Sequence, residues 1–417
     1  VALSMDYALI GARDDNELAP GAGAAYLFRF QNATWTQIAK LTTRLSGFEH
    51  FFGNSVALAG DYALIGAPGE RAERGAAYVF KRDSSGASEV WREQFRLQAS
   101  DANAGDFFGL TVALEHDWAV IGAYGDDERA GNAGAVYLFQ REPSGGQETW
   151  NEKAKLIAGD GKAEDFFGIA LAMSGDVLCI GAYGDDTRAD HAGAAYVFKR
   201  FASPSDAEWR QQAKLTASDG AADDDFGSAV AIANDYALVG ALMQFSAGPG
   251  AAYLFKSSAG QWLELEKLEA PDAELNDRFG NAVALGNDCA LVGARFESEK
   301  GRNAGAAYLF DGLRNIVHVE QPAVFPPLAF ALEQNYPNPF NPFNPATTIS
   351  FSLPRAGFVT LKVFDTHGGE IATIIAERLV AGKHRVPWHA GGVASGVYLC
   401  RLQAGELVQI RKLVLLQ

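Results

Sequence analysis

Short runs of alternating apolar and polar residues fill most of the chain and predict β-strands. One stretch shows the pattern: an alternating run at Ser55–Ala59, a turn at Gly60-Asp61 and a returning run at Tyr62–Gly66. This arrangement predicts a tight hairpin. Two more strands are expected at Ala76–Lys81 and Trp91–Gln98. Helical periodicity is absent from the region, so we predict an all-β fold built from four-stranded units.

The four-stranded unit recurs six times within residues 1–318, and three short strings recur with it. The Ile/Val-Gly-Ala string places its glycine at Gly11, Gly66, Gly122, Gly181, Gly240 and Gly293. A Gly-Ala-Ala/Val-Tyr string carries Tyr26, Tyr78, Tyr137, Tyr196, Tyr253 and Tyr308. A strand with tryptophan contains Trp35, Trp91, Trp150, Trp209 and Trp262. Tandem units of this kind are typical of β-propeller blades, whereas the coils of a β-solenoid, the rival architecture, are shorter.

These strings resemble the FG-GAP repeats of integrin-type propellers. In the second copy the motif stands as Phe52-Gly53-Asn54-Ser55-Val56 and then Ile65-Gly66-Ala67-Pro68, and Phe-Gly recurs in the later copies. The resemblance implies a β-propeller used in recognition or adhesion. Six blades are expected, with the last one completed by a strand at Asn315–Glu320. The alternative is a seven-bladed propeller truncated before Val1.

Composition changes after residue 318. Pro322, Pro326 and Pro327 mark a linker over residues 319–334. Residues 335–417 then alternate again, and the expected strands are Thr348–Leu353, Phe358–Asp365, His384–Trp388, Gly396–Leu402 and Leu407–Leu416. Strands of this number and length predict a small β-sandwich of Ig-like type.

This last segment is similar to the C-terminal sorting domain of proteins that leave the cell by type IX secretion. The matching pieces are the Asn335–Pro342 opening, Ile349–Pro354 and the region around Gly396 and Tyr398, followed by the closing Lys412, Leu413, Val414 and Leu415. The resemblance implies a Gram-negative bacterium, the type IX secretion machinery as a partner, and a secreted or cell-surface location.

Charge and composition exclude several classes of protein. The formal net charge is -16, which argues against a nucleic-acid binder, and the 3 cysteines cannot form a disulfide framework. No apolar run reaches the roughly 18 residues of a membrane span. Residues 331–417 hold 8 basic and 5 acidic side chains, a net of +3, so the rest of the chain, with 27 and 46, has -19.

Acidic residues recur in two patterns that bear on metal and ligand binding. The turn between the first two strands ends in one aspartate, such as Asp61, and one carboxylate on a tight turn cannot wrap a calcium ion. Pairs spaced by five precede Phe-Gly at Asp101/Asp106, Asp160/Asp165, Asp219/Asp224 and Asp272/Asp277. Capping of turns explains them most simply, and a bridging cation such as Ca²⁺ is the alternative.

A third acidic pattern follows the second strand of the unit, at Asp14, Asp15, Asp126, Asp127, Asp185 and Asp186. The second, fifth and sixth copies break this pattern, and the fifth places Met243 and Phe245 there instead. In a ring of blades these loops share one rim. The rim is either a ligand-binding surface or a solvated acidic edge, because loops on a rigid scaffold often carry binding residues.

Motifs of catalysis are missing: the sequence has no Gly-x-Ser-x-Gly, no His-Glu-x-x-His and no Cys-x-x-Cys. No catalytic residue is predicted. We expect a non-enzymatic propeller that binds a surface glycan or protein. The alternatives are a self-assembling structural subunit of an extracellular fibre or surface layer, suggested by incomplete blades at both ends of the repeat region, and a hydrolase that uses rim carboxylates such as Asp126 and Asp185.

Overall fold

The computed structural model describes the chain except residues 46, 85–88, 146, 203–206, 244–247, 287, 300, 314–329, 336–337, 341–345, 356, 380–381, 392, 406 and 417. It consists of two compact units, Val1–Val317 and His318–Gln417. Strands dominate both units, and the one helix among the described residues is α1 (Glu70–Glu73). No helix in the described part of the chain is long and apolar enough to cross a bilayer.

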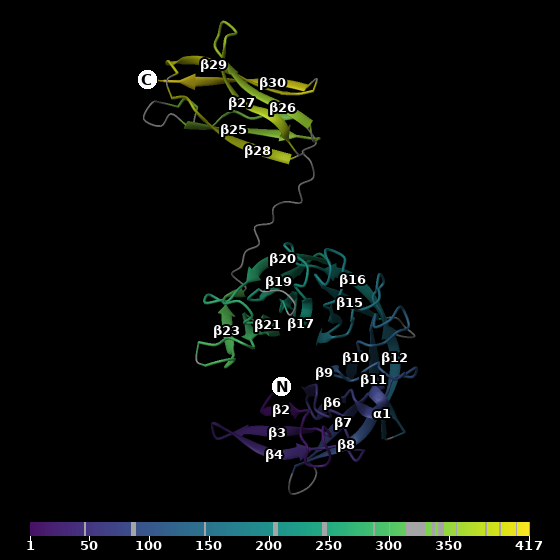
Figure 1. The fold of residues 1–417 in the computed structure, drawn as a ribbon. Helices are drawn as coiled ribbons and strands as arrows, with labels where there is room; N and C mark the ends of the chain where they lie inside the picture. The colour runs from purple at the N-terminus through teal and green to yellow at the C-terminus, as the bar shows by residue number, and fades with distance from the viewer. Residues whose placement is uncertain are drawn as a thin grey trace. The chain divides into compact units, whose positions relative to one another are not determined.

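The first unit contains six antiparallel sheets whose strands follow one another in chain order (Figure 1). The first two sheets consist of β1 (Ala2–Ser4), β2 (Tyr7–Ala12), β3 (Ala24–Gln31), β4 (Thr34–Leu41), β5 (Val56–Ala59), β6 (Tyr62–Ala67), β7 (Ala76–Asp83) and β8 (Val90–Leu97). The third and fourth consist of β9 (Thr111–Glu115), β10 (Trp118–Ala123), β11 (Ala135–Ser144), β12 (Gln147–Leu156), β13 (Ala170–Ser174), β14 (Val177–Ala182), β15 (Ala194–Ala202) and β16 (Ala207–Leu215). The last two consist of β17 (Phe226–Ala233), β18 (Tyr236–Ala241), β19 (Ala251–Ser258), β20 (Gln261–Leu268), β21 (Phe279–Leu285), β22 (Cys289–Ala294) and β23 (Ala306–Asp311).

Successive sheets pack face to face, so the apolar core of this unit is divided among the junctions between them. One cluster joins Leu9 and Leu27 of the first sheet to Ile65 and Tyr78 of the second. The four later junctions have clusters of the same kind. Inner strands of the middle sheets, such as β6 and β10, therefore bury both faces, one toward each neighbouring sheet. The predicted all-β propeller of repeated four-stranded units is confirmed.

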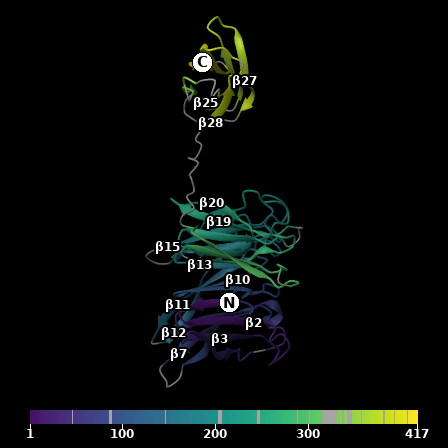
Figure 2. The same cartoon turned by 90° about the vertical axis from the view of Figure 1, so that its left-hand side faces the viewer.

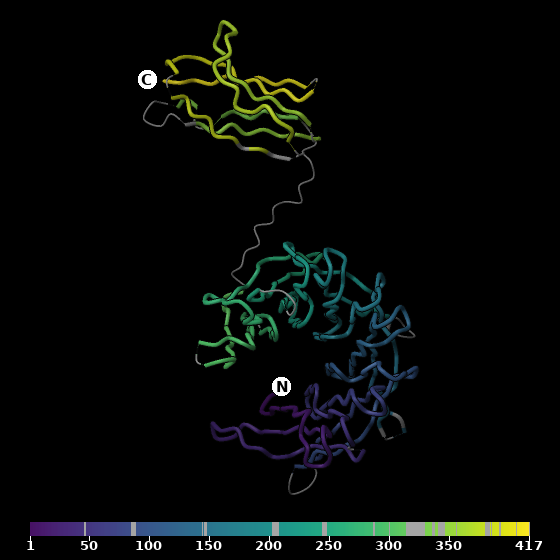
Figure 3. Tube along the Cα trace, viewed as in Figure 1, coloured from purple at the N-terminus to yellow at the C-terminus, as the bar shows by residue number. Residues whose placement is uncertain are grey.

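The sheets follow an arc, and the first and last sheets stand at its two ends (Figures 1 and 3). No strand pairing links these two sheets among the described residues, and the sixth sheet has three strands there. The strand expected at Asn315–Glu320 lies outside the described residues. Figure 2 turns the open side of the arc, with the N-terminus, toward the viewer.

The second unit has two sheets that enclose one core. Its strands are β24 (Ala331–Leu332), β25 (Ala346–Leu353), β26 (Gly357–Phe364), β27 (Glu370–Leu379), β28 (Gly382–His389), β29 (Gly396–Ala404) and β30 (Leu407–Leu415). The orders are β24-β25-β28 and β27-β26-β29-β30. Ile349 and Phe351 of one sheet share a cluster with Leu361 and Leu402 of the other, which makes the unit a β-sandwich. Its Ig-like type stays a prediction.

Candidate ligand-binding site

A buried tyrosine, two carboxylates and a lysine form a cluster at one end of the third sheet. The Tyr137 hydroxyl lies 2.7 Å from Asp101 and 2.8 Å from Asp126. The Lys155 ammonium lies 2.7 Å from Asp101 and 2.8 Å from Asp126. Tyr137 comes from β11, Lys155 from β12 and the carboxylates from two loops. The cluster therefore fastens two loops to the sheet.

The same cluster recurs around the arc, because tyrosine and a basic residue occupy matching places on the third and fourth strands. The corresponding groups are Tyr26, Asp15 and Lys40; Tyr78, Glu70 and Arg96; Tyr196, Asp160, Asp185 and Lys214; and Tyr253, Asp219 and Lys267. Asp126 and Asp185, which the sequence placed among the ligand-binding candidates, are buried in these clusters.

Burial and hydrogen bonding shift the pKa values of Lys155 and Asp101 in opposite directions. Burial alone would lower the pKa of Lys155, but hydrogen bonds to Asp101 and Asp126 outweigh it and raise the pKa. Burial acts to raise the pKa of Asp101, while hydrogen bonds from Lys155 and Tyr137 bring it below its ordinary value. Burial and the hydrogen bond to Asp101 raise the pKa of Tyr137. At neutral pH the cluster thus holds charged Asp101 and Lys155 beside a neutral phenol.

The other predicted rim residues lie nearer to solvent. Asp127 and Asp186 accept backbone hydrogen bonds from Asn132 at 2.7 Å and from His191 at 2.9 Å. Asp14 is exposed beside Arg13, at 3.5 Å.

The fifth copy completes the predicted rim, and a trio of side chains that includes Asp186 was not predicted as a group. Met243 is half-buried, with its backbone N–H bonded to the Asp224 carbonyl at 3.1 Å, and Phe245 lies outside the described residues. Among the described residues, Asp186, Asp190 and His191 bring three possible metal-ligand atoms within 4.8 Å of one another.

The two members of each predicted aspartate pair make different contacts. The first member binds tyrosine and lysine, as Asp101 does, and Asp272 accepts a hydrogen bond from Tyr308 at 2.8 Å. The second member accepts a hydrogen bond from the backbone N–H three residues earlier, in the pairs Asp106–Asn103, Asp165–Lys162, Asp224–Ala221 and Asp277–Glu274. This is the geometry of a capped turn. A cation shared by each pair stays a prediction.

The sequence pattern did not single out a row of aromatic rings on the loops of the third and fourth sheets. The centroids of Phe107 and Tyr124 are 5.1 Å apart, those of Tyr124 and Phe166 5.8 Å, and those of Phe166 and Tyr183 5.1 Å. All four side chains are half-buried. The phenylalanines directly precede the repeated Phe-Gly, so the doubled phenylalanine at 107–108 and 166–167 was the available signal.

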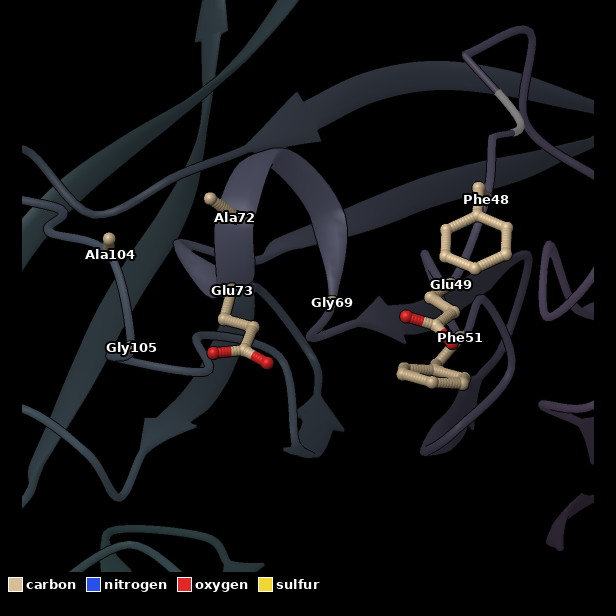
Figure 4. Close-up of a pocket in the computed structure, with 8 residues that line it drawn as sticks. All are labelled: Phe48, Glu49, Phe51, Gly69, Ala72, Glu73, Ala104 and Gly105. Atoms are coloured by element: carbon tan, nitrogen blue, oxygen red, sulfur yellow. The ribbon is translucent and has the colours of Figure 1, made fainter.

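A pocket of about 580 Å³ lies among loops of the first and second junctions, with a lining that extends from Phe48 to Gly105. Figure 4 shows the Phe48 and Phe51 rings with the Glu49 carboxylate on one side, and Glu73 across from them. Phe48 is 65% exposed. The Arg13 guanidinium lies 4.4 Å from the centroid of the Phe51 ring and covers it. The sequence indicated this place only through the missing aspartates after the second strand of the second copy, because Glu73 lies in the same loop.

In the second unit, the opening motif holds the final strand. The Asn338 side chain accepts a hydrogen bond from the Val414 N–H at 2.9 Å and donates one to the Lys412 carbonyl at 3.2 Å. Phe340 exchanges backbone hydrogen bonds with Val414 and Leu416.

The residues predicted for sorting fall into two groups in this unit. Tyr398, Leu413 and Leu415 are buried in the core, and the Lys412 side chain is exposed. Gly396 and Val414 are half-buried, and they lie on the adjacent strands β29 and β30. Part of the motif therefore supports the fold, and Lys412 remains open to contact.

Comparison with known protein families gives two matches. The model of the FG-GAP repeat matches residues 35–80, 91–139, 150–198, 209–255 and 262–310. The model of the secretion system C-terminal sorting domain matches residues 334–416. No curated protein matches the chain.

The solved structures that match this chain in backbone arrangement have low sequence identity to it. PorZ, a surface component of the type IX secretion system of Porphyromonas gingivalis, is 13% identical with a TM-score of 0.38; the match covers 98% of this chain and 51% of PorZ, so the chain spans about half of that protein. A hypothetical selenium-binding protein from Sulfolobus tokodaii is 11% identical, with 89% and 77% covered and a TM-score of 0.39. A subtype N11 neuraminidase-like protein of a bat influenza A virus is 8% identical, with 71% and 82% covered and a TM-score of 0.35.

Proposed function

Because the chain belongs to the FG-GAP repeat family and ends in a secretion-system sorting domain, we propose that it is a non-enzymatic binding or adhesion propeller that acts outside the cell. The sorting domain addresses the chain to the type IX secretion machinery and hence to the cell surface or the medium. The ligand of the propeller is a surface glycan or a surface protein.

The pocket lined by Phe48, Glu49, Phe51 and Glu73 is the observation that carries this proposal. The exposed Phe48 ring beside carboxylates suits a ligand that offers an apolar face together with hydroxyl or cationic groups. The net charge of -19 over residues 1–330 favours a ligand with positive charge, since complementary charge speeds association. The buried Asp126 and Asp185 are already engaged by lysine and tyrosine, and this supports a binding role over a hydrolytic one.

Binding to arrays of surface glycans and surface proteins tests the proposal. We expect the full chain to bind a ligand, and the double variant Phe48→Ala, Glu49→Gln to bind it at least about tenfold more weakly, as expected for an aromatic anchor in a pocket. The matched control is Phe201→Ala, which removes another exposed ring, on β15. An equal loss of binding in both variants, or no bound ligand on either array, would count against the pocket as the ligand-binding site.

A structural subunit of an extracellular fibre or surface layer is the second candidate. The exposed side chains of Leu3 in the first sheet and Leu309 in the last favour it, because apolar sheet faces promote association. Electron microscopy at high protein concentration decides between the two. Regular assemblies are expected from a structural subunit, and dispersed particles are expected from a binding protein.

A further inference from the structure

One loop of the fourth sheet brings together three side chains of the types that bind metal ions. The loop connects β14 to β15 and carries Asp186, Asp190 and His191. Two carboxylate oxygens and one imidazole nitrogen, one ligand atom from each residue, lie within 4.8 Å of one another. Both aspartates are exposed and the histidine is half-buried, so an ion in solution has access to all three.

Hydrogen bonds hold the backbone of this loop in place. The Asp190 carbonyl accepts a hydrogen bond from the Asp223 N–H of the next sheet's loop at 2.9 Å. The His191 carbonyl accepts one from the Asp225 N–H at 3.1 Å. Within the loop, the His191 N–H donates to the Asp186 carboxylate at 2.9 Å. The three ligands are therefore mounted on a fixed backbone, which favours metal binding because little order has to be gained when the ion arrives.

The third sheet has the same loop without the full set of ligands. There Asp127 accepts a hydrogen bond from the Asn132 N–H at 2.7 Å, and the Gly131 and Asn132 carbonyls accept hydrogen bonds from the next sheet's loop at 2.8 and 3.1 Å. Glycine and asparagine thus occupy the places of Asp190 and His191. The turn needs its first aspartate, but it forms without a carboxylate and an imidazole at the other two places.

The backbone at His191 also does not require a histidine. Its φ is +49°, in the left-handed region, where the third sheet has Asn132 at +53° and the first sheet has Gly21 at +64°. Glycine adopts this conformation without strain, and asparagine is the side chain that tolerates it most readily. The imidazole of the fourth sheet is therefore not explained by the turn that carries it.

A buried carboxylate oxygen near the loop has no hydrogen-bond partner among the described residues. Asp165 is 1% exposed, and its Oδ2 accepts a hydrogen bond from the Lys162 N–H at 2.8 Å, but its Oδ1 has none. Burial, and then the negative charges of Asp185 and Asp186, raise the pKa of Asp165. Lys214 acts in the opposite direction, but it is already bonded to Asp185. A cation bound at Asp186 would supply positive charge where these carboxylates face one another.

We propose that Asp186, Asp190 and His191 bind one divalent transition-metal ion, with Zn²⁺ as the probe. Each aspartate supplies one carboxylate oxygen, the histidine supplies one ring nitrogen, and water completes the coordination. Imidazole together with carboxylate suits Zn²⁺, whereas Ca²⁺ prefers oxygen ligands throughout. Bonds of about 2.0–2.2 Å place two ligands of a tetrahedral Zn²⁺ roughly 3.4 Å apart, so small side-chain rotations within the group are enough.

Isothermal titration calorimetry with ZnCl₂ tests the proposal on the metal-free full chain, prepared without a histidine tag. We expect saturable binding of one Zn²⁺ per chain, and binding of Ca²⁺ at least about tenfold more weakly. His191→Asn copies the residue of the third sheet, so the turn is kept while one ligand is lost, and Zn²⁺ affinity should fall at least about tenfold. The matched control is His116→Asn, which removes an exposed histidine beside Glu115 and should leave the affinity unchanged.

A second variant builds the site where the chain lacks it. Gly131→Asp together with Asn132→His places the same three ligands, with Asp127, on the loop of the third sheet. A Cβ on Gly131 would meet no atom within 4 Å, so the new side chain fits. We expect this double variant to keep the melting temperature of the wild type in the absence of metal and to bind two Zn²⁺ ions per chain.

Three results would overturn the proposal: no saturable binding of Zn²⁺ to the wild type, equal affinity of the wild type and His191→Asn, or a double variant that still binds a single ion. Ca²⁺ bound as tightly as Zn²⁺, with no effect of His191→Asn, would assign the cation to the aspartate pairs instead. None of these measurements involves the pocket at Phe48, so the proposed ligand site stands or falls separately.

Discussion

At the scale of single residues, the aspartates of the propeller have roles that their spacing alone does not reveal. Asp126 is buried and bonds to Tyr137 and Lys155, while the adjacent Asp127 is exposed and bonds to a backbone N–H. A buried carboxylate costs free energy unless a cation and hydrogen bonds compensate it. Where the carboxylate of a cluster is buried, as Asp126 is, loss of its basic partner is therefore expected to lower stability most.

Lys155→Met is expected to lower the free energy of unfolding by about 2–4 kcal/mol, because it leaves the buried Asp126 without its cation. Chemical denaturation measures this. Lys267→Met is the matched control, since its partner Asp219 is exposed, and it should cost less than about 1 kcal/mol. Equal losses in the two variants would show that the buried carboxylate does not depend on Lys155.

Asp165→Asn is expected to change how stability depends on pH. Burial raises the pKa of Asp165 to about 6, so between its ordinary value of 3.8 and 6 the folded state holds a proton that the unfolded state has lost. Stability contributed by this group is present below that range and is lost as pH rises through it. The asparagine has no such titration, so we expect the variant to gain about 1–2 kcal/mol relative to the wild type between pH 4 and pH 7.

The control for this prediction is Asp160→Asn, because hydrogen bonds from Lys214 and Tyr196 outweigh burial and lower the pKa of Asp160. Its stabilising effect is lost only as pH falls below the ordinary range of an aspartate. The stability of Asp160→Asn relative to the wild type should therefore stay nearly constant between pH 5 and pH 7. Urea denaturation across pH gives both profiles, and a flat difference for Asp165→Asn would contradict the raised pKa.

At the scale of elements, contacts between distant segments decide which strands hold together. In the propeller, Gly181 admits the backbone of the next sheet, because a Cβ there would lie 1.9 Å from the Gly227 carbonyl oxygen, so this periodic glycine is a junction residue. In the second unit, Asn338 and Phe340 bind the last strand, β30, from a segment more than 70 residues earlier. The two ends of the sorting domain thus form one structure.

Asn338→Ala is expected to loosen β30. The variant loses the hydrogen bonds to Val414 and Lys412, at a cost of about 1–3 kcal/mol to the second unit. Hydrogen exchange of the Val414 amide should speed up, and mass spectrometry or NMR measures it. Gln403→Ala, which removes a half-buried side chain on β29 whose amide donates to the Gly405 carbonyl at 3.3 Å, is the control and should leave that exchange unchanged.

At the scale of the whole molecule, the chain consists of an acidic propeller and a mildly basic sorting unit. Residues 1–330 have a net charge of -19 and residues 331–417 have +3. The sorting unit supplies the export address, and the propeller supplies the ligand-binding surface that we propose. This division predicts that export depends on the second unit alone.

A chain that ends at residue 330 lacks the sorting domain matched at residues 334–416 and is expected to stay inside the cell envelope. Fractionation of a bacterium with a type IX secretion system measures its location, with the full chain as the control. Appearance of the shortened chain in the medium at the level of the full chain would contradict the role of the sorting unit.

Local pattern was enough to predict much of the fold. Alternation around Tyr62 and Tyr78 identified strands, and the spacing of Gly66 and its counterparts identified six units, because both depend on residues close in sequence. The pocket at Phe48 and Glu73 was not predictable in this way. Its walls come from different loops, and no local spacing shows that these loops lie together.

The sequence by itself determined the repeated sheets, the two units and the export address, because these depend on periodicity and on short ordered motifs. Tertiary structure alone decided which aspartates are buried, and it brought Asn338 against Val414. It also placed Gly181 against the backbone of the next sheet. The physical reason is that burial, charge compensation and steric fit depend on contacts between segments that are distant along the chain. A repeat motif has the same sequence whether or not a neighbouring sheet covers it.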